Sequence, residues 1–465
     1  MSDIKFGTDG WRAIVGKDFT YENVKRVTLA IAKYHYDNFG IDKKILVGFD
    51  PRNMALEFAV YTAKILSEFG INVILSDNIV ATPVLAYAAK HYEANAIMFT
   101  ASHNPAEYLG MKFIPEYAGP ATDEITNEIV KNIDAEMSVY EFDSKNYVTK
   151  SFDEIYVEHI ISIIDFDKIT AAKIKLNYDG LHGAAAPLFA KILADNKIDF
   201  SYINLNPDPQ FGGKMPDPKE KFLKELQSMC TITHNIGLSN DGDGDRFGAF
   251  NEEGIFVSAN EIIIILLKHL KENKLYSGQL VKTVGASTMN DIAAKQLGVD
   301  VIETAVGFKW VGKAMRENDV IIGGEESGGL SIKGHIPEKD GIIANLLILE
   351  SMAYSGKTLV QLQKELSESV GYDFINTRVD LELDSQEEQD QIIDKFRDVE
   401  VINPLKVKSK NTLDGLKLYF DDDLSWVLIR KSGTEPLLRI YFESDSQEKI
   451  NQLKDSVDKI ARGKV

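Results

Sequence analysis

The sequence is poor in cysteine and in long apolar runs. Cys230 is the one cysteine among 465 residues, so no disulfide can form within the chain, as is usual in reducing compartments. The longest apolar run, residues 262–267, is far shorter than the roughly 20 residues that span a bilayer. Residues 1–10 lack the apolar core of a signal peptide. We therefore expect a cytoplasmic protein with no membrane partner.

Basic residues are scarce relative to acidic ones. Lysine and arginine number 52, aspartate and glutamate 71, and the formal net charge is -19. A field of that sign repels nucleic acids and anionic membranes, so we expect neither as a partner. A phosphorylated small molecule is also an anion, so its site in this chain has to be a local basic pocket. The sequence leaves both a monomer and a homodimer open.

The first three quarters of the chain repeat one pattern of strands and helices. Residues 44–50 and 72–76 are typical of strands, and residues 55–69 between them are typical of an amphipathic helix. The alternation restarts near residues 173 and 254. Such βαβ units predict α/β domains with mostly parallel sheets.

The last part of the chain has a different pattern. Residues 373–383 alternate like an antiparallel strand, and two further predicted strands, 426–429 and 438–443, flank a turn-rich loop. This pattern predicts a small α+β domain. The four predicted domains are residues 1–148, 149–253, 254–369 and 370–465.

Three predicted strands of the α/β units end in polar loops. These loops are residues 102–105 (SHNP), 241–246 (DGDGDR) and 323–329 (GGEESGG). Ligands of open α/β sheets bind beyond the carboxyl ends of the strands. Three units that face one cleft would therefore each contribute one of these loops to a single site.

The second loop predicts a metal site. Asp241, Asp243 and Asp245 occupy alternate positions, and alternate side chains of an extended segment project to the same side. Three hard oxygen ligands suit Mg²⁺, and the intervening glycines let the backbone bend around it. A solvated acidic turn is the plainer alternative. A calcium EF-hand is disfavoured, because Arg246 stands where that loop requires glycine.

Ser102 is the hydroxyl at the tip of the first loop. A phosphate on Ser102 would complete the metal shell, so we place Ser102 with the three aspartates as a metal ligand. The Gly-x-Ser-x-Gly elbow of a hydrolase is absent around it. Lys112, in the strand pattern that follows, can act as a point charge or a proton carrier. An ordinary turn serine and a surface lysine are the alternatives.

The loop between the last two predicted strands is a candidate phosphate cradle. It contains Arg430, Ser432, Gly433 and Thr434. An arginine fork, two hydroxyls and a backbone freed by glycine are groups that bind phosphate oxygens.

Together these segments resemble the α-D-phosphohexomutase superfamily. Five stretches look like its motifs in the order that the family has them: residues 6–12, 100–105, 241–246, 324–328 and 430–436. The resemblance covers the whole chain. It implies three related α/β domains with mixed sheets and a C-terminal α+β domain, arranged around a central cleft.

The resemblance also implies an activity. Members interconvert hexose 1-phosphates and hexose 6-phosphates through a phosphoserine and a hexose 1,6-bisphosphate, which also acts as activator, and they use Mg²⁺. Arg12, Arg246 and Lys112 would supply positive charge beside Ser102. Glu325 and Ser327 would hold hydroxyls of the sugar ring.

The resemblance is less definite about the sugar and the proton acceptor. Residues 307–310 and 335–341 look more like phosphoglucomutases, so we expect a phosphoglucomutase with possible phosphomannomutase activity. A phosphoglucosamine mutase is the alternative, and a non-catalytic sugar-phosphate-binding protein is a second one from another class. His103, Lys112 and Lys309 are candidates for the proton acceptor, and we also assign Lys309 to the substrate site.

Overall fold

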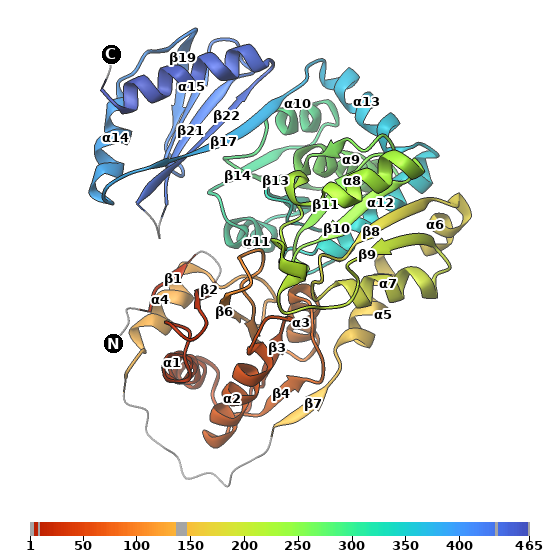
Figure 1. Cartoon of the computed structure of the whole chain (residues 1–465), viewed down its shortest axis with the longest axis vertical. Helices are drawn as coiled ribbons and strands as arrows, with labels where there is room; N and C mark the ends of the chain where they lie inside the picture. The colour runs from red at the N-terminus through yellow and green to blue at the C-terminus, as the bar shows by residue number, and fades with distance from the viewer. Residues whose placement is uncertain (1–3, 8–9, 136–146, 433–435, 464–465) are drawn as a thin grey trace.

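The computed structural model describes residues 4–7, 10–135, 147–432 and 436–463. Its strands form four separate sheets, which we number as domains I to IV in chain order (Figure 1). Within the described residues, no helix combines the length and the apolar character that a membrane crossing needs. The α/β fold class with a C-terminal α+β domain is confirmed.

Domain I is built on a seven-stranded sheet in the order β1-β2-β6-β5-β3-β4-β7, in which β5, β3, β4 and β7 run parallel. Its elements are β1 (Phe6–Gly7), β2 (Gly10–Ile14), α1 (Tyr21–Phe39), β3 (Ile45–Phe49), α2 (Ala55–Glu68), β4 (Val73–Ser76), α3 (Thr82–His91), β5 (Asn95–Phe99), β6 (Tyr108–Ile114), α4 (Asp123–Lys131) and β7 (Val148–Lys150).

Domain II has a five-stranded sheet in the order β12-β11-β10-β8-β9. Its elements are α5 (Asp153–Ile163), α6 (Phe166–Ala172), β8 (Lys175–Asp179), α7 (Ala186–Asp195), β9 (Asp199–Ile203), η1 (Phe211–Gly213), η2 (Glu220–Phe222), α8 (Lys224–Thr233), β10 (Ile236–Asn240), β11 (Phe247–Phe250) and β12 (Phe256–Val257).

Domain III has a four-stranded sheet in the order β14-β13-β15-β16. Its elements are α9 (Ala259–Glu272), β13 (Gln279–Thr283), α10 (Thr288–Gln296), β14 (Val301–Thr304), α11 (Phe308–Glu317), β15 (Val320–Gly324), β16 (Leu330–Ile332), α12 (Gly341–Ser355) and α13 (Leu359–Val370).

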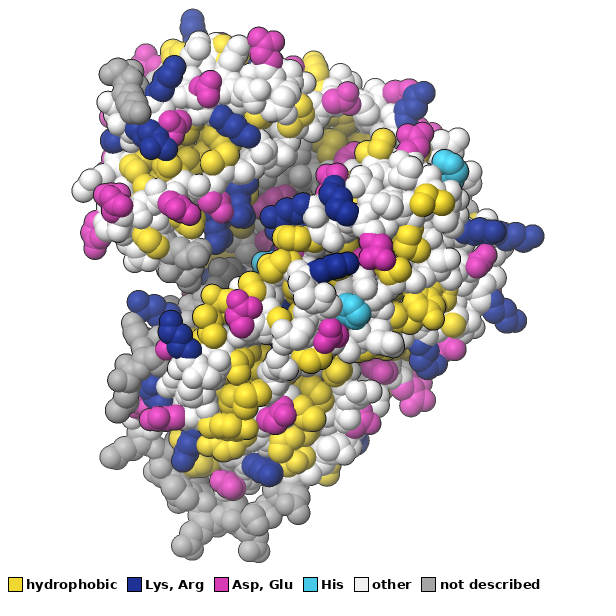
Figure 2. All heavy atoms as spheres, viewed as in Figure 1, with side chains coloured by type: hydrophobic (Ala, Val, Ile, Leu, Met, Phe, Trp, Pro, Cys, Tyr) yellow, Lys and Arg dark blue, Asp and Glu magenta, His cyan; other side chains and the backbone are white. Residues whose placement is uncertain are grey.

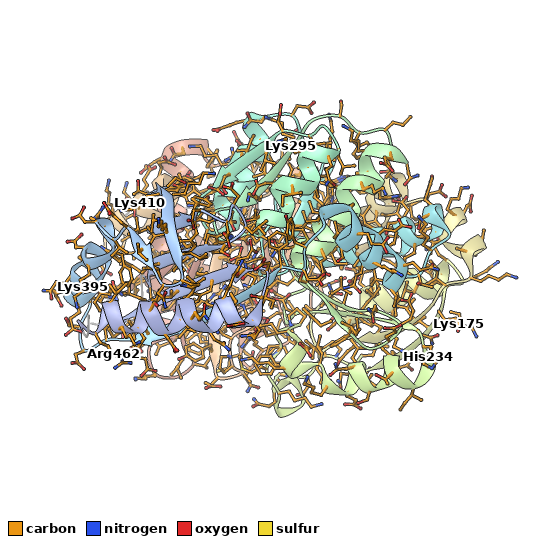
Figure 3. The ribbon with its side chains drawn as sticks, turned by 90° about the horizontal axis from the view of Figure 1, so that it is seen from above. Lys175, His234, Lys295, Lys395, Lys410 and Arg462 are labelled. Atoms are coloured by element: carbon orange, nitrogen blue, oxygen red, sulfur yellow. The ribbon has the colours of Figure 1, made fainter. Side chains whose placement is uncertain are left out.

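Domain IV has a six-stranded antiparallel sheet in the order β17-β22-β21-β20-β19-β18. Its elements are β17 (Ile375–Glu382), α14 (Glu387–Arg397), β18 (Val401–Ile402), β19 (Leu405–Asn411), β20 (Leu416–Phe420), β21 (Trp426–Lys431), β22 (Leu437–Ser444) and α15 (Gln447–Ala461). Seen from above, its Lys395 and Arg462 lie at the opposite end of the molecule from Lys175 and His234 of domain II (Figure 3).

Domains I, II and III share one hydrophobic core, whereas domain IV has a core of its own. The shared core runs from Leu85 of α3 through Phe189 of α7 to Ile348 of α12. The core of domain IV packs the helices α14 and α15 against one face of its sheet, with Phe396 and Leu453 fully buried. Burial of apolar surface is the main stabilising term of a fold. It joins the first three domains through this large core, and it joins domain IV to domain III through a small cluster of Val284, Trp426, Leu428 and Tyr441.

The sequence predicts a helix over residues 219–229, and the structure differs there. A short 3₁₀ turn, η2, precedes the helix α8, which begins at Lys224. The carbonyl of Pro218 packs against Gly248 of β11, where a Cβ would lie 2.3 Å from it. The backbone is extended at Lys219 (ψ 149°) and departs from helical angles at Leu223 (φ -104°, ψ 30°), so a continuous helix forms only from Lys224.

A buried carboxylate on α12 links domain III to the start of domain II. Glu350 is fully buried and accepts hydrogen bonds from Lys274 Nζ at 2.7 Å, His269 Nε2 at 2.9 Å and the backbone N–H of Asp165 at 2.7 Å. Burial alone would raise the pKa of Glu350, but the hydrogen bonds from His269 and Lys274 outweigh it and hold the pKa below its ordinary value. The carboxylate is therefore stabilised in its charged form.

Replacing Glu350 by alanine should lower the free energy of unfolding by about 3 kcal/mol, because it leaves buried donors without their acceptor. Since the pKa is lowered in the fold, this contribution exists above the ordinary glutamate range and disappears as the pH falls through the lowered value. Thermal unfolding of the parent and of Glu350→Ala at pH 7 and near pH 3 measures both effects. Glu368→Ala, which removes the exposed pair with Lys364, is the matched control. Equal melting temperatures of parent and variant at pH 7 would contradict the prediction.

Candidate active site

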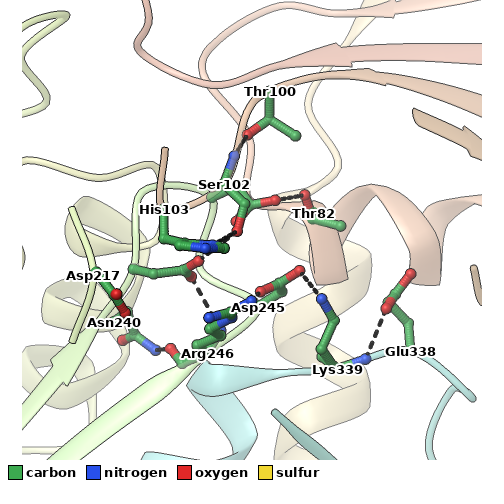
Figure 4. A network of polar contacts seen from close by, with 12 residues as sticks. Thr82, Thr100, Ser102, His103, Asp217, Asn240, Asp245, Arg246, Glu338 and Lys339 are labelled. Carbon is green, nitrogen blue, oxygen red and sulfur yellow. Dashed lines mark hydrogen bonds and ion pairs between the residues drawn. The ribbon is translucent and has the colours of Figure 1, made fainter. Parts of the chain in front are cut away.

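The tip of the β5–β6 loop places Ser102 in a strained, buried position. Its φ is 51°, in the left-handed region that few non-glycine residues adopt, and its side chain is inaccessible to solvent. The backbone N–H of Ser102 donates to Thr100 Oγ1 at 2.8 Å, which stabilises this turn. Ser102 Oγ donates to Asp241 Oδ2 at 2.8 Å and lies 3.3 Å from His103 Nδ1 (Figure 4).

The loop after β10 brings three aspartates together. Asp241, Asp243 and Asp245 are fully buried, and one oxygen of each lies within 4.8 Å of the others. Gly242 allows this loop to approach Ser102, because a Cβ at Gly242 would lie 2.6 Å from the Ser102 carbonyl oxygen. The structure thus joins two of the predicted loops, from domains I and II.

Two lysines from different domains contact the aspartates. Lys112 Nζ of β6 donates to Asp243 Oδ2 at 3.0 Å and to Asp245 Oδ2 at 3.2 Å. Lys339 Nζ, in the segment before α12, donates to Asp245 Oδ2 at 2.5 Å (Figure 4). Lys112 is a predicted site residue, whereas Lys339 is not among our predicted residues.

Thr82 is a second neighbour that the sequence does not single out for the site. It is the first residue of α3, and its Oγ1 donates to Asp243 Oδ2 at 2.7 Å while its backbone N–H donates to the carbonyl of Asp243. The sequence marks Thr82 only as a residue that opens a helix. Hydrogen bonding to a residue 161 positions away depends on tertiary structure, so no local signal distinguishes this threonine.

The pKa values of two of the clustered aspartates are shifted in opposite directions. Burial, and then repulsion from Asp243 and Asp245, raises the pKa of Asp241 well above its ordinary value. Burial would also raise the pKa of Asp243, but Lys112 and Lys339 outweigh it and lower that pKa. The charged form is therefore favoured at Asp243 and disfavoured at Asp241 while no cation is bound.

The cluster fits a divalent cation. Asp243 Oδ1 and Asp245 Oδ1 are buried and accept no hydrogen bond from any described residue. Leaving buried carboxylate oxygens without a donor is costly, and oxygen atoms of this kind are the ligands that hard cations prefer. The three aspartates of this loop are therefore able to bind a metal ion.

Arg12 contacts the Ser102 loop, and Arg246 follows directly on the aspartate loop. Arg12, on β2, donates from Nη1 to Asn104 Oδ1 at 2.7 Å. The backbone N–H of Arg246 donates to Asp241 Oδ1 at 3.0 Å. The positive charge of Arg246, then burial and the charge of Arg12, lowers the pKa of His103 well below its ordinary value. Arg12 and Arg246 thus bring positive charge close to His103 and the Ser102 loop, as a phosphate site in an acidic protein requires.

Arg52 is the functional residue that sequence reasoning missed most clearly. Its guanidinium donates to the carbonyl of Ser102 at 2.6 Å and to three further carbonyls of the same loop. Those acceptors are Asn104 (2.7 Å), Pro105 (2.7 Å) and Tyr108 (3.0 Å). The Asp50–Arg52 segment that follows β3 offers the strand-end position as its only sequence signal.

The carboxylate of Asp50 binds the remaining N–H of the Arg52 guanidinium, at Nε. Arg52 Nε donates to Asp50 Oδ2 at 3.2 Å, and both side chains are buried. Burial raises the pKa of Asp50 to about 6, although Arg52 opposes this shift. The guanidinium also stacks over the ring of Phe211 of domain II, 4.8 Å from its centroid. Arg52 therefore fixes the Ser102 loop through its backbone carbonyls, and its contact with Phe211 connects the loop to domain II.

The loop after β15, which the resemblance predicts to bind the sugar, is also largely buried. Glu325 Oε1 accepts a hydrogen bond from the backbone N–H of Gly307 at 3.0 Å, and burial together with the charge of Glu326 raises the pKa of Glu325 to about 7. Ser327 is half-buried in the same turn. Lys309, on α11, forms an ion pair with Asp123 of domain I at 2.5 Å. Lys309 thus bridges two domains in this structure.

The domain IV residues lie apart from the Ser102 cluster. Arg430, on β21, is paired with Asp414. Ser432 is buried, and its backbone N–H donates to the carbonyl of Leu437 at 3.0 Å. The predicted residues Gly433 and Thr434 lie outside the described residues. Figure 2 shows a hollow between domain IV and the rest of the molecule, with Lys, Arg, Asp and Glu side chains along its walls.

His335, in the phosphoglucomutase-like segment 335–341, contacts an aspartate and a second histidine. Its Nε2 lies 2.8 Å from Asp340 Oδ2, and its Nδ1 lies 2.9 Å from Nε2 of His159. Asp340 also accepts a hydrogen bond from Tyr156 at 2.6 Å and caps the helix α12. These contacts join domains II and III.

The chain matches models for all four domains of the phosphoglucomutase/phosphomannomutase family. The matches are alpha/beta/alpha domain I over residues 3–139, domain II over 154–254, domain III over 258–370 and the C-terminal domain over 378–460.

Individual relatives match over nearly the whole length. A phosphoglucosamine/phosphogalactosamine mutase of Sulfurisphaera tokodaii is 31% identical and covers 99% of each chain. A phosphoglucosamine mutase of Methanocaldococcus jannaschii is 30% identical and covers 98% of each. A crystal structure from Thermus thermophilus, provisionally assigned as a phosphomannomutase, is 30% identical with a TM-score of 0.87, and covers 99% of this chain and 100% of that one.

The four-domain fold is that of the α-D-phosphohexomutase superfamily, which consists of enzymes that transfer a phosphoryl group within a hexose phosphate. Within it, this chain belongs to the phosphoglucomutase/phosphomannomutase family.

The Arg52 contacts generate a prediction. A lysine at this position keeps the charge but cannot donate to four carbonyls and a carboxylate at once. Arg52→Lys should therefore lower turnover by about tenfold or more, since misplacing a reacting group by a small distance is costly. Steady-state kinetics with a hexose phosphate measures this, and circular dichroism checks the fold. Arg462→Lys, at an exposed pair with Asp458, is the control. Turnover equal to that of the parent would remove Arg52 from this role.

Proposed function

We propose that this protein is a phosphoglucosamine mutase that interconverts glucosamine 1-phosphate and glucosamine 6-phosphate through a phosphate carried on Ser102. The observation that supports the reaction best is the hydrogen bond of 2.8 Å from Ser102 Oγ to Asp241, within a buried cluster of three aspartates. A hydroxyl held against a candidate cation site and surrounded by positive charge suits phosphoryl transfer.

The chain's own residues supply most of the requirements of that transfer. In one half-reaction the bond between phosphorus and Ser102 Oγ breaks and a bond from phosphorus to a sugar hydroxyl oxygen forms. The proton of that hydroxyl passes to Ser102 Oγ, which becomes a hydroxyl again. His103 and Lys112 both lie beside Ser102 or the aspartates and are placed to exchange that proton. Arg12 and Arg246 offset the charge of the phosphoryl oxygens. The second half-reaction returns the other phosphate of the hexose bisphosphate to Ser102.

Asp241, Asp243 and Asp245, with a phosphate oxygen on Ser102, would hold Mg²⁺. When bound, this ion neutralises negative charge on the transferring group. We assign a hexose 1,6-bisphosphate as the activator, because it is the compound able to phosphorylate Ser102 from the reaction's own cycle.

The similarity to relatives changes our choice of sugar. Residues 307–310 and 335–341 favour glucose phosphates, whereas two of the relatives at 30 and 31% identity carry the names of glucosamine phosphate enzymes. The Thermus thermophilus structure carries a mannose name instead. We therefore put glucosamine phosphates first and keep glucose and mannose phosphates as the second candidate.

A coupled assay with the 1-phosphates of glucosamine, glucose and mannose tests the proposal. We expect kcat/KM to be highest for glucosamine 1-phosphate, and a higher value for glucose or mannose would favour the second candidate. Ser102→Ala should abolish turnover and also the mass increase of one phosphate that a bisphosphorylated sugar gives to the parent. Turnover within tenfold of the parent by Ser102→Ala would exclude the phosphoserine. Absence of both turnover and phosphate uptake in the parent would favour a binding protein.

Removal of metal with a chelator should stop turnover, and Mg²⁺ should restore it. Calorimetric titration of the stripped protein with Mg²⁺ gives a readout that does not depend on activity. We expect Asp243→Asn to weaken Mg²⁺ binding by about tenfold or more, because it removes one of three charged ligands. Asp195→Asn, at an exposed pair with Lys191, should bind as the parent does. Full activity after verified stripping would contradict the metal site.

A further inference from the structure

The turn between β19 and β20 carries a carboxylate that joins two domains. Asp414 Oδ2 accepts a hydrogen bond from Arg430 Nε at 2.9 Å and lies 2.7 Å from Arg430 Nη2. The same oxygen accepts the backbone N–H of Val306 at 2.8 Å. One carboxylate oxygen therefore contacts the candidate phosphate-binding arginine of domain IV and a loop of domain III.

The sequence of the turn permits this close contact. Gly415 has φ +86°, and a Cβ there would lie 2.3 Å from the carbonyl oxygen of Ile429 and 3.0 Å from Arg430 Cγ. A residue with a side chain would push the turn away from Arg430. Asn411, at the start of the turn, donates to Glu303 Oε1 of domain III at 2.8 Å, which provides a second attachment.

Asp414 uses only one edge of the guanidinium. A guanidinium carries five N–H groups in a rigid plane. The Nε and Nη2 side faces Asp414, so Nη1 and the second hydrogen of Nη2 remain at the end of the side chain, the edge that binds phosphate with two parallel hydrogen bonds. The side chain of Arg430 is 13% exposed and that of Asp414 is 24% exposed, so solvent screens this pair only in part.

The loop at Val306 leads directly to the sugar site. The next backbone N–H, that of Gly307, donates to Glu325 Oε1 at 3.0 Å. Consecutive peptide groups thus bind Asp414, which holds Arg430, and Glu325, the candidate ligand of the ring hydroxyls. Residues 306–307 therefore set the distance between Arg430, the candidate phosphate ligand, and Glu325, the candidate sugar ligand.

We propose that Asp414 is a positioning residue, which aims the end of the Arg430 guanidinium at the non-reacting phosphate of the substrate and keeps it in register with Glu325. This inference rests on the proposed function, since Arg430 matters here as a ligand of a sugar phosphate. A competing role, in which Asp414 blocks Arg430 until phosphate displaces it, predicts effects of the opposite sign.

Kinetics of two substitutions tests the proposal. Asp414→Ala removes the acceptor and should raise KM for the sugar phosphate by about tenfold with a smaller change in kcat, as expected for loss of a charge-assisted contact that orients a binding group. Asp414→Asn keeps an oxygen that accepts from Arg430 and Val306, so it should recover part of that loss. Asp423→Asn, at an exposed pair with Lys408 in the next turn of the same domain, is the control and should match the parent.

A double-substitution cycle separates positioning from simple docking of the domains. If Asp414 acts through Arg430, Asp414→Ala should change kcat/KM less than about twofold in an Arg430→Ala background. An undiminished loss in that background would show a role independent of Arg430 and overturn the proposal. A lower KM in Asp414→Ala would overturn it in favour of the blocking role, and a KM equal to that of the parent would also overturn it.

Failure of the proposed function gives a different result. If the parent turns over none of the three sugar phosphates, the mutase assignment fails, and Asp414 is then tested by calorimetric titration with inorganic phosphate. A weaker affinity of Asp414→Ala than of the parent, with no further weakening beyond that of Arg430→Ala in the double variant, supports the positioning role. Equal affinities of the parent and Asp414→Ala overturn it.

Discussion

The site depends on the mutual repulsion of three buried aspartates. Three carboxylates within 4.8 Å of one another cannot stay charged in a buried place without nearby positive charge, because both burial and repulsion disfavour ionisation. Lys112 comes from domain I and Lys339 from domain III, while the aspartates belong to domain II. The compensation of this charge therefore requires three domains to be packed together, and it links the architecture of the molecule to its chemistry.

The hydrophobic cores also group domains I, II and III together and leave domain IV separate. Domains I, II and III share one core, and the groups around Ser102 that must stay fixed within a fraction of an ångström lie among them. Domain IV keeps its own core and contacts domain III partly through polar groups, such as Lys417 Nζ, which donates to the carbonyl of Val284 at 2.7 Å. Polar contacts exchange with water at little net cost, whereas separating an apolar core is expensive. Arg430, the candidate phosphate ligand, is thus carried by a domain that lies outside the large shared core and contacts domain III through a smaller apolar cluster.

The sequence predicts the fold class and the loops that meet, because both depend on local pattern. Alternating strands and helices define the α/β units, and polar loops at strand ends mark the site. It does not identify Arg52, Thr82 or Lys339, since their roles depend on partners far away in the chain: Thr82 and Asp243 are 161 positions apart. An arginine or threonine at the end of a strand or the start of a helix looks the same whether or not a loop carbonyl packs against it. The choice of sugar is harder to predict. Glucosamine and glucose phosphates differ in one substituent, and short segments such as 307–310 do not distinguish between them.

The packing around the β5–β6 loop holds the backbone of Ser102 in a strained conformation. A non-glycine residue at φ 51° costs about 1 kcal/mol or more and persists where the surroundings enforce it. Here the enforcement is specific: Thr100 accepts the backbone N–H, and Arg52 binds the carbonyl of the same residue. Both backbone groups of Ser102 are therefore occupied, which directs its side chain towards Asp241. The free energy stored in the turn is small beside the energy of the charged groups around it, so these backbone contacts are sufficient to maintain the strained conformation.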